Sequence, residues 1–224
     1  ASNKRAIEKA KVLNADAIIF DLEDSVPPDE KIEARNHIEG VVKNNGREFG
    51  EKKLIIRINS LDTEWGVKDL SAVINSVPHA VLLPKVDTPE VVERVETVLD
   101  SSDKNPIKVW AMVETAVGVI NANKVALEGR RLEAFILGTY DLVKELRATE
   151  TQNRNELLYA LSHVLLVARA YNLVCIDGVY NSFNDDEGLK LACGQGRNMG
   201  FDGKTLIHPK QVSITNEVFS PSPA

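Results

Sequence analysis

Short apolar runs alternate with amphipathic stretches along the whole chain. The apolar runs predict strands at residues 16–21, 53–58, 79–84, 107–113, 132–137, 173–177 and 203–207. Apolar residues at helical spacing predict helices at residues 3–13, 29–44, 65–76, 88–100, 116–128, 139–146, 153–171 and 186–199. This alternation is typical of a parallel sheet covered by helices, so we expect the α/β class.

The first predicted helix, residues 3–13, has no strand before it. A strand upstream of Ala1 would bring the total to eight, the number in a TIM (β/α)8 barrel. We therefore expect one barrel domain over residues 1–224, with the first strand missing and the chain truncated at both ends. The alternative is an open, doubly wound sheet of seven strands. No GxGxxG motif follows any predicted strand, which weakens the dinucleotide-binding version of that alternative.

Charged side chains follow nearly every predicted strand. They are Asp21, Glu23, Asp24, Arg57, Lys85, Glu114, Asp141, Asp177, Lys204 and His208. The carboxyl ends of parallel strands meet on one face, where active sites lie. A purely structural core has no use for so many polar groups on one rim, so the pattern indicates an enzyme.

Glu114 and Asp141 are the most informative pair, because each follows a strongly apolar strand. Two ionised carboxylates close together need a compensating cation, and Mg²⁺ prefers oxygen ligands. The alternative is that each carboxylate caps the helix that follows it. The nearby cluster of Asp21, Glu23 and Asp24 is either a solvated loop or a set of groups that orients metal-bound water.

Arg57 interrupts a strand that should be uniformly apolar. A buried charge is costly unless it is paired, so Arg57 must meet a carboxylate, an anionic ligand or an open rim. A guanidinium suits a carboxylate or an enolate oxygen, which favours a substrate contact. Lys85 serves either the substrate or the acidic cluster. His208, which precedes Pro209, is expected to brace a strand–helix junction rather than to act as a base.

Composition narrows the range of partners and compartments. The net charge of -6 argues against nucleic acid as the main partner. No apolar run approaches the length of a membrane span, and no secretory signal is visible. Two cysteines in apolar settings favour a reducing compartment. We expect a cytoplasmic protein, or one of the mitochondrial matrix if a targeting peptide has been removed, with neither nucleic acid nor a membrane as partner.

Several stretches of the sequence resemble the citrate lyase beta-subunit-like family of CoA-ester lyases, within the HpcH/HpaI aldolase group. The matching stretches are IEKAKVLNADAIIFDLEDSVPPDEKIEAR, IIRINSLDTEW, VLLPKVDTPE, AMVETAVGV, LGTYDL, DGVYNSFNDDEGL and GFDGKTLIHPKQV. They occur in family order over nearly the whole chain. The resemblance implies a TIM barrel and a Mg²⁺-dependent lyase that cleaves 3-hydroxyacyl-CoA thioesters, such as citryl-CoA or malyl-CoA, into an acyl-CoA and a 2-oxo acid.

The resemblance also implies roles for particular residues. Glu114 and Asp141 would bind the metal, and Arg57 and Glu114 would contact the substrate. Glu23 and Asp24, the acidic pair of the LED motif, would support the metal's water shell, and we expect the neighbouring Asp21 to act with them. Lys9 would contact the CoA nucleotide, although the arginine that the family usually has near the start of this helix aligns with Asn3.

The resemblance leaves several points open. It implies a homo-oligomer, a trimer or a hexamer, and a general base that relatives supply from a C-terminal segment lying across a neighbouring subunit. The alternatives are a CoA-thioester hydrolase or malate-synthase-like enzyme on the same site, a non-catalytic citrate lyase-like subunit, and an HpaI-type aldolase acting on free 2-oxo acids.

Overall fold

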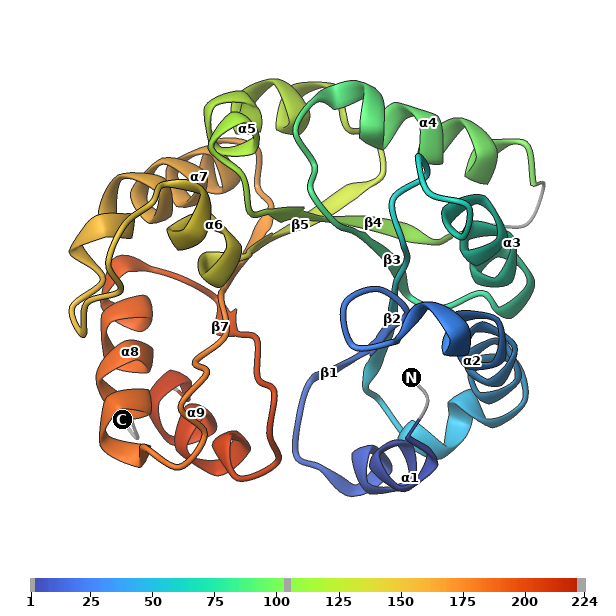
Figure 1. The fold of residues 1–224 in the computed structure, drawn as a ribbon, viewed down its shortest axis with the longest axis horizontal. Helices are drawn as coiled ribbons and strands as arrows, with labels where there is room; N and C mark the ends of the chain where they lie inside the picture. Colours follow the sequence, from blue (N-terminus) through green and yellow to red (C-terminus); the bar gives the residue numbers. More distant parts are fainter. Residues whose placement is uncertain (1–2, 103–105, 221–224) are drawn as a thin grey trace. The chain divides into compact units, whose positions relative to one another are not determined.

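A computed structural model describes residues 3–102 and 106–220 of the chain (Figure 1). The strands are β1 (Ala17–Asp21), β2 (Lys53–Arg57), β3 (Ala80–Leu83), β4 (Lys108–Val113), β5 (Leu132–Leu137), β6 (Val174–Asp177) and β7 (Gly203–Lys204). The helices are α1 (Lys4–Val12), α2 (Lys31–Asn45), α3 (Gly66–Ser76), α4 (Pro89–Asp100), α5 (Ala116–Glu128), α6 (Thr139–Glu145), α7 (Leu158–Ala170), α8 (Asp186–Met199) and α9 (Gln211–Phe219). Short 3₁₀ helices lie at Pro28–Glu30, Gly46–Phe49 and Asn155–Leu157.

The strands form a seven-stranded sheet in chain order, from β1 to β7. The pairs β1–β2, β2–β3, β5–β6 and β6–β7 are parallel. A parallel sheet with a helix in each connection confirms the α/β class that the alternating pattern predicts. The eight-stranded barrel and its missing first strand remain predictions.

The chain divides into two compact units. Unit 1 comprises Ala1–Pro84, Glu90–Trp110 and Arg130–Leu132, and unit 2 comprises Lys85–Pro89, Ala111–Gly129 and Glu133–Ala224. The boundary falls within both β4 and β5, so two strands contribute residues to both units. The prediction of a single domain remains a prediction.

In unit 1, the register of β1 and β2 determines which polar residues meet. The pairing runs from Ala17 opposite Lys53 to Asp21 opposite Arg57. The middle of β2 and all of β3 are buried, as expected for strands in a parallel sheet. Helices α2 and α3 pack side by side against these strands (Figure 1). The pairing therefore brings two predicted site residues together at the carboxyl end of the first two strands.

In unit 2, strands β5 and β6 pair in parallel and β6 pairs with β7. Helices α5 and α7 pack together, and so do α8 and α9 (Figure 1). The end of β4 and most of β5 are buried. The carboxyl ends of β4, β5 and β6 carry Glu114, Gly138 and Asp177 respectively, each directly after or at the last residue of its strand.

The C-terminal part of the chain departs from the predictions in two ways. Strand β7 has only two residues, because the chain turns after Thr205 and the backbone N–H groups of Ile207 and His208 both donate to the Gln211 side chain. Helix α9, which begins at Gln211, was not predicted. The predicted helix over 153–171 begins instead as a 3₁₀ turn, and α7 starts at Leu158.

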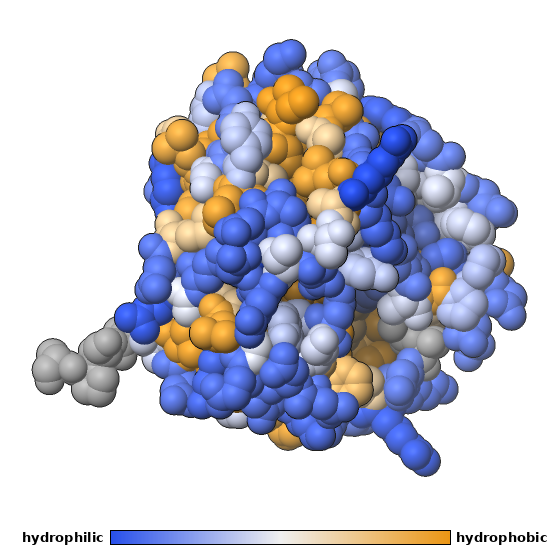
Figure 2. Space-filling model, turned by 60° about the vertical axis from the view of Figure 1, so that its left-hand side comes forward, coloured by the Kyte–Doolittle hydropathy of each residue, from blue (hydrophilic) through white to orange (hydrophobic). Residues whose placement is uncertain are grey.

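Apolar side chains are also exposed on the outer helices of unit 2. Figure 2 shows apolar surface gathered on the face turned forward, and exposed apolar residues of α5 and α7 include Val117, Ile120, Leu127, Tyr159 and Leu166. No helix in the described part of the chain is both long and apolar enough to cross a membrane. The homo-oligomer remains a prediction.

Candidate functional site

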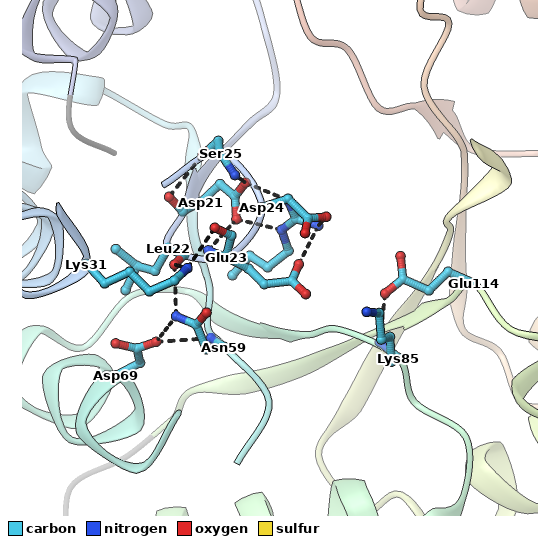
Figure 3. A network of polar contacts seen from close by, with 11 residues as sticks. Asp21, Leu22, Glu23, Asp24, Ser25, Lys31, Asn59, Asp69, Lys85 and Glu114 are labelled. Carbon is cyan, nitrogen blue, oxygen red and sulfur yellow. Dashed lines mark hydrogen bonds and ion pairs between the residues drawn. The ribbon is translucent and has the colours of Figure 1, made fainter. Parts of the chain in front are cut away.

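The guanidinium of Arg57 lies among the three carboxylates of the segment 21–25, which we call the acidic loop. Arg57 donates to both oxygens of Asp21, from Nε at 2.6 Å and from Nη2 at 2.5 Å. Its Nη1 lies 2.9 Å from Glu23 Oε2 and 3.5 Å from Asp24 Oδ2. Figure 3 shows this cluster at the end of β1. The sequence left three possibilities for Arg57, namely a carboxylate, an anionic ligand or an open rim. The structure shows that its partners are carboxylates.

The charges in this cluster stabilise one another. Burial alone would raise the pKa of Asp21, but the hydrogen bonds and charge of Arg57 outweigh burial and hold it below its ordinary value. Burial also opposes the charge on Arg57, yet Asp21, Glu23 and Asp24 together raise the pKa of Arg57. Both groups therefore stay ionised at neutral pH, and the guanidinium is only partly shielded, with 14% of its side chain exposed.

The acidic loop is also ordered by its own backbone. Asp21 accepts hydrogen bonds from the backbone N–H groups of Glu23 and Ser25 at 2.9 and 3.0 Å. The Val26 N–H donates to the carbonyl of Glu23. Asp24, by contrast, is largely exposed, with 66% of its side chain accessible. Asp21 therefore shapes the turn while it binds Arg57, and Asp24 stands at its edge.

In unit 2, Glu114 follows β4 as a buried carboxylate that is 2% exposed. Its Oε1 accepts a hydrogen bond of 2.9 Å from the backbone N–H of Lys85, which has a left-handed backbone conformation (φ 47°). A Cβ at Gly138 would collide with the Cβ of Glu114 and lie 2.6 Å from its Oε2. Glycine is therefore required at the end of β5 to leave room for this carboxylate.

Asp141 lies in the first turn of α6, three residues beyond Gly138. Its side chain is 42% exposed and lies 3.9 Å from Lys144. Because Gly138 both packs on Glu114 and begins α6, the structure joins the two predicted metal ligands through one short connection.

The capping alternative for these two carboxylates is wrong. Helix α5 is capped by Thr115, whose side chain accepts a hydrogen bond from the Gly118 N–H. Helix α6 begins at Gly138 without a side-chain cap. Neither Glu114 nor Asp141 is therefore the N-cap residue of the helix that it precedes or opens.

A second charged cluster lies in unit 2 and contains Asp177 and Lys204. Both lie in predicted strands, but the sequence suggested no particular role for either. Asp177, at the end of β6, accepts two hydrogen bonds from Arg154 Nη1 at 2.7 and 2.9 Å and one from Lys204 Nζ at 2.9 Å. Asp177 and Lys204 are almost completely buried. Burial would raise the pKa of Asp177, but Lys204 and Arg154 hold it below its ordinary value, while burial lowers the pKa of Lys204. The role of Arg154 could not be predicted from its position in the sequence, because it lies in the connection between α6 and α7 and not after a strand.

The remaining predicted residues lie as follows. Lys9 is exposed on α1, and Lys85 exposes its side chain while its backbone supports Glu114. His208 stacks on Phe183 and accepts a hydrogen bond from the Lys210 N–H, which agrees with the expected bracing of a turn.

No group of three or more His, Cys, Asp or Glu side chains that could hold a metal ion occurs within residues 3–102 and 106–220. A protein site for Mg²⁺ commonly uses one or two carboxylates and fills the remaining positions with water or substrate oxygens. A two-carboxylate site such as Glu114 with Asp141 fits that chemistry better than a closed protein cage.

Comparison with known proteins identifies the family. The HpcH/HpaI aldolase/citrate lyase family model matches residues 1–209. The chain belongs to this family. It is 47% identical over 223 residues to a protein named (3S)-malyl-CoA thioesterase from Cereibacter sphaeroides, covering all of this chain and 75% of that protein. It is 32% identical over 227 residues to the citrate lyase subunit beta of Escherichia coli, covering 99% of this chain and 74% of the subunit.

Solved structures share the fold. RipC from Yersinia pestis aligns with a TM-score of 0.82 and 26% identity, covering 95% of this chain and 92% of RipC. CitE from Mycobacterium tuberculosis, solved in complex with magnesium, acetoacetate and coenzyme A, aligns with a TM-score of 0.80 and 27% identity, covering 98% and 76% of the two chains. The citrate lyase beta-like resemblance of the sequence is therefore confirmed.

Proposed function

We propose that this chain is a Mg²⁺-dependent enzyme that acts on the CoA thioester of a 3-hydroxy dicarboxylic acid of the malyl-CoA type, and that it hydrolyses the thioester. The observation that carries the proposal is the pair of carboxylates Glu114 and Asp141, which are joined through Gly138 and freed from helix capping. The relative that is 47% identical over the whole chain and is named a malyl-CoA thioesterase supports hydrolysis as the outcome.

Glu114 and Asp141 would hold the metal. Glu114 brings a buried, positioned carboxylate, and Asp141 brings one that reaches solvent, so water and substrate oxygens can complete the coordination. When bound, Mg²⁺ would polarise substrate oxygens and stabilise negative charge that develops on them. The solved relative with magnesium, acetoacetate and coenzyme A supports this cofactor and this class of ligands.

Arg57 and the acidic loop would bind and orient the acid portion of the substrate. A guanidinium that is ionised and surrounded by three carboxylates could exchange one of these partners for the acid group of the substrate. Glu23 and Asp24 would orient water around the cation. In hydrolysis, water attacks the thioester carbonyl, the carbon–sulfur bond breaks, and the products are the free hydroxy acid and CoA thiol.

A second candidate reaction is carbon–carbon cleavage of the same substrate. It is supported by the citrate lyase beta subunits, which are 30–32% identical to this chain. In this reaction the hydroxyl proton is lost, the carbon–carbon bond breaks, and acyl-CoA departs as an enolate that a nearby guanidinium would stabilise. Malyl-CoA would then yield glyoxylate and acetyl-CoA.

The deciding experiment follows the products formed from malyl-CoA in the presence of Mg²⁺. Hydrolysis releases malate and free CoA thiol, whereas cleavage releases glyoxylate and acetyl-CoA with no thiol. Citramalyl-CoA and citryl-CoA extend the panel. Glu114→Gln should abolish both turnover and Mg²⁺ binding, and its retention of either would contradict the metal assignment. A wild-type protein without turnover on all three thioesters would instead favour a non-catalytic subunit.

The proposal includes a complete TIM barrel, with one strand more than the seven of the described residues. It also includes a CoA contact at Lys9, a homo-oligomer, and a cytoplasmic or mitochondrial matrix location. A crystal structure with Mg²⁺ and a CoA thioester would test the metal ligands and the Lys9 contact together, and light scattering would test the oligomer.

A further inference from the structure

Two backbone carbonyls at the root of the acidic loop accept hydrogen bonds from buried side chains. Lys31 Nζ donates to the carbonyl oxygens of Leu22 and Glu23, both at 2.9 Å. Asn59 Nδ2 donates to the Leu22 carbonyl oxygen at 2.8 Å. Figure 3 shows both donors reaching this loop. The loop is therefore held from α2 and from the segment after β2, in addition to its own turns.

One of the two donors, Asn59, is itself held by a buried ion pair. Asp69, on α3, accepts hydrogen bonds from Asn59 N at 3.0 Å and Asn59 Nδ2 at 2.6 Å. Its other oxygen accepts from Arg35 Nε at 2.6 Å. Lys31, Arg35, Asn59 and Asp69 are all buried. We call these four residues the bracing network.

Stability alone gives little reason for such a network. Buried ion pairs stabilise a fold no better than well-packed apolar side chains of similar volume, because desolvation offsets the attraction. What a buried polar network adds is a defined geometry, because moving one member breaks its hydrogen bonds to the others. Here that geometry is imposed on a loop whose three carboxylates repel one another and surround Arg57.

We propose that the bracing network positions the acidic loop, so that Glu23 and Asp24 keep fixed places around Arg57 and the metal's water shell. This inference rests on the proposed function for its catalytic consequence. Its structural part, that the network holds the loop, stands on the hydrogen bonds alone. Lys31 and Asn59 are the residues in direct contact with the loop, and Asp69 and Arg35 act through Asn59.

The test uses Lys31→Met, which keeps the length of the side chain and removes the donor, and Lys43→Met as its matched control. Lys43 is an exposed lysine in the last turn of the same helix. Hydrogen exchange of the Glu23, Ser25 and Val26 amides reports loop order without any substrate. Losing hydrogen bonds from a charged donor should accelerate these amides about 10- to 100-fold in Lys31→Met, with no change in the control.

The functional readout is Mg²⁺ affinity together with kcat and KM for the thioester. Loss of a group that orients metal-bound water typically costs about 10- to 100-fold in metal affinity or activity. We expect Lys31→Met to lose kcat and Mg²⁺ affinity by that range, with a smaller change in KM. Trp65 adds a spectroscopic readout, because Lys31 Nζ lies 5.1 Å from its ring centroid, and its fluorescence should change in this variant.

Asp69→Asn provides a second variant if Lys31→Met does not fold, as judged by far-UV circular dichroism. It keeps the shape of the side chain, releases Arg35 and acts on the loop through Asn59, so its effects should be in the same direction and smaller. Unchanged exchange of the loop amides in a folded variant would overturn the positioning inference.

Faster exchange with unchanged Mg²⁺ affinity would also overturn the inference, because the loop would then not serve the site. A wild-type protein that binds no Mg²⁺ would instead refute the proposed function and, with it, the catalytic consequence. The exchange result would still decide whether the network holds the loop.

Discussion

The carboxyl ends of β2 and β6 each carry a cluster of charged side chains, and the two clusters have opposite compositions. At the end of β2, one guanidinium, Arg57, is surrounded by three carboxylates and stays partly exposed. At the end of β6, one carboxylate, Asp177, is shared by two cations and is completely buried. A partly exposed cation with surplus partners can exchange one of them for a ligand, whereas a fully buried anion cannot be reached. The same sequence signal, a charge after an apolar strand, therefore marks a partly exposed cluster in one place and a fully buried ion pair in the other, and we propose a functional role only for the first.

The largest expected effect is on stability, at Asp177. Asp177→Asn leaves Lys204 buried without its counter-ion, and breaking a buried pair in this way costs about 3–5 kcal/mol. We expect the free energy of unfolding to fall by about that amount in urea titrations, while the folded fraction keeps its turnover. If Asp177→Asn were as stable as the wild type but inactive, the role of Asp177 would be functional and not structural.

Arg57→Lys should reduce turnover more than stability, which is the reverse of the effect expected for Asp177→Asn. Lysine keeps the charge but loses the two parallel hydrogen bonds to Asp21, and removing a preorganised donor to developing charge typically costs about 10²–10³ in kcat. Stability should fall by less than in Asp177→Asn, because the remaining groups stay in contact with solvent. Steady-state kinetics and a thermal melt on the same preparation check both statements. A purely structural Arg57 would show the loss of stability without the loss of turnover.

The two regions should also share an acid dependence. The pKa values of Asp177 and Asp21 are both lowered in the folded protein, so these carboxylates bind fewer protons folded than unfolded near pH 3.8. Their stabilisation is fully present above pH 3.8 and is lost as the pH falls through their folded pKa values. Urea titrations from pH 5 to pH 2.5 should show this decline in the wild type and a shallower one in Asp177→Asn. Equal slopes would contradict the role of Asp177.

The smallest expected effect is at Asp24. Its side chain is mostly exposed and lies 3.5 Å from Arg57, and exposed ion pairs contribute about 0–1 kcal/mol. Asp24→Asn should therefore change the free energy of unfolding by less than about 0.5 kcal/mol and should reduce Mg²⁺ affinity less than Glu23→Gln does. Calorimetric titration with Mg²⁺ on both variants makes the comparison. A larger loss in Asp24→Asn would move the principal water-orienting role from Glu23 to Asp24.

Much of the fold could be predicted from local patterns. Apolar runs predicted the first six strands to within about two residues. The proline at the start of α4 and the glycine after α5 marked helix ends because of their restricted or permissive backbones. Strand β7 and helix α9 were not predicted in this form, because the Gln211 side chain accepts two backbone N–H groups and turns the chain after Thr205.

The candidate site could be predicted only in part. Residue type and position after a strand selected Arg57, Glu114 and Asp141. They did not reveal that Thr115 caps α5, which removes the alternative role of Glu114, nor that Arg154 reaches Asp177 from a connection. The bracing network was not predicted, because Lys31 and Arg35 resemble ordinary surface residues of an amphipathic helix, and Arg35 pairs with Asp69, 34 residues away along the chain.

By itself, the sequence determined the α/β class, the family and the residue types able to bind a cation, because these depend on periodicity and on short motifs that are local along the chain. Only the tertiary structure decided which charge pairs with which. Burial and hydrogen-bond partners depend on strand register and helix packing, and these bring Arg57 to the acidic loop and Asp177 to Lys204. The same pairing leaves Arg57 partly exposed and Asp177 fully buried.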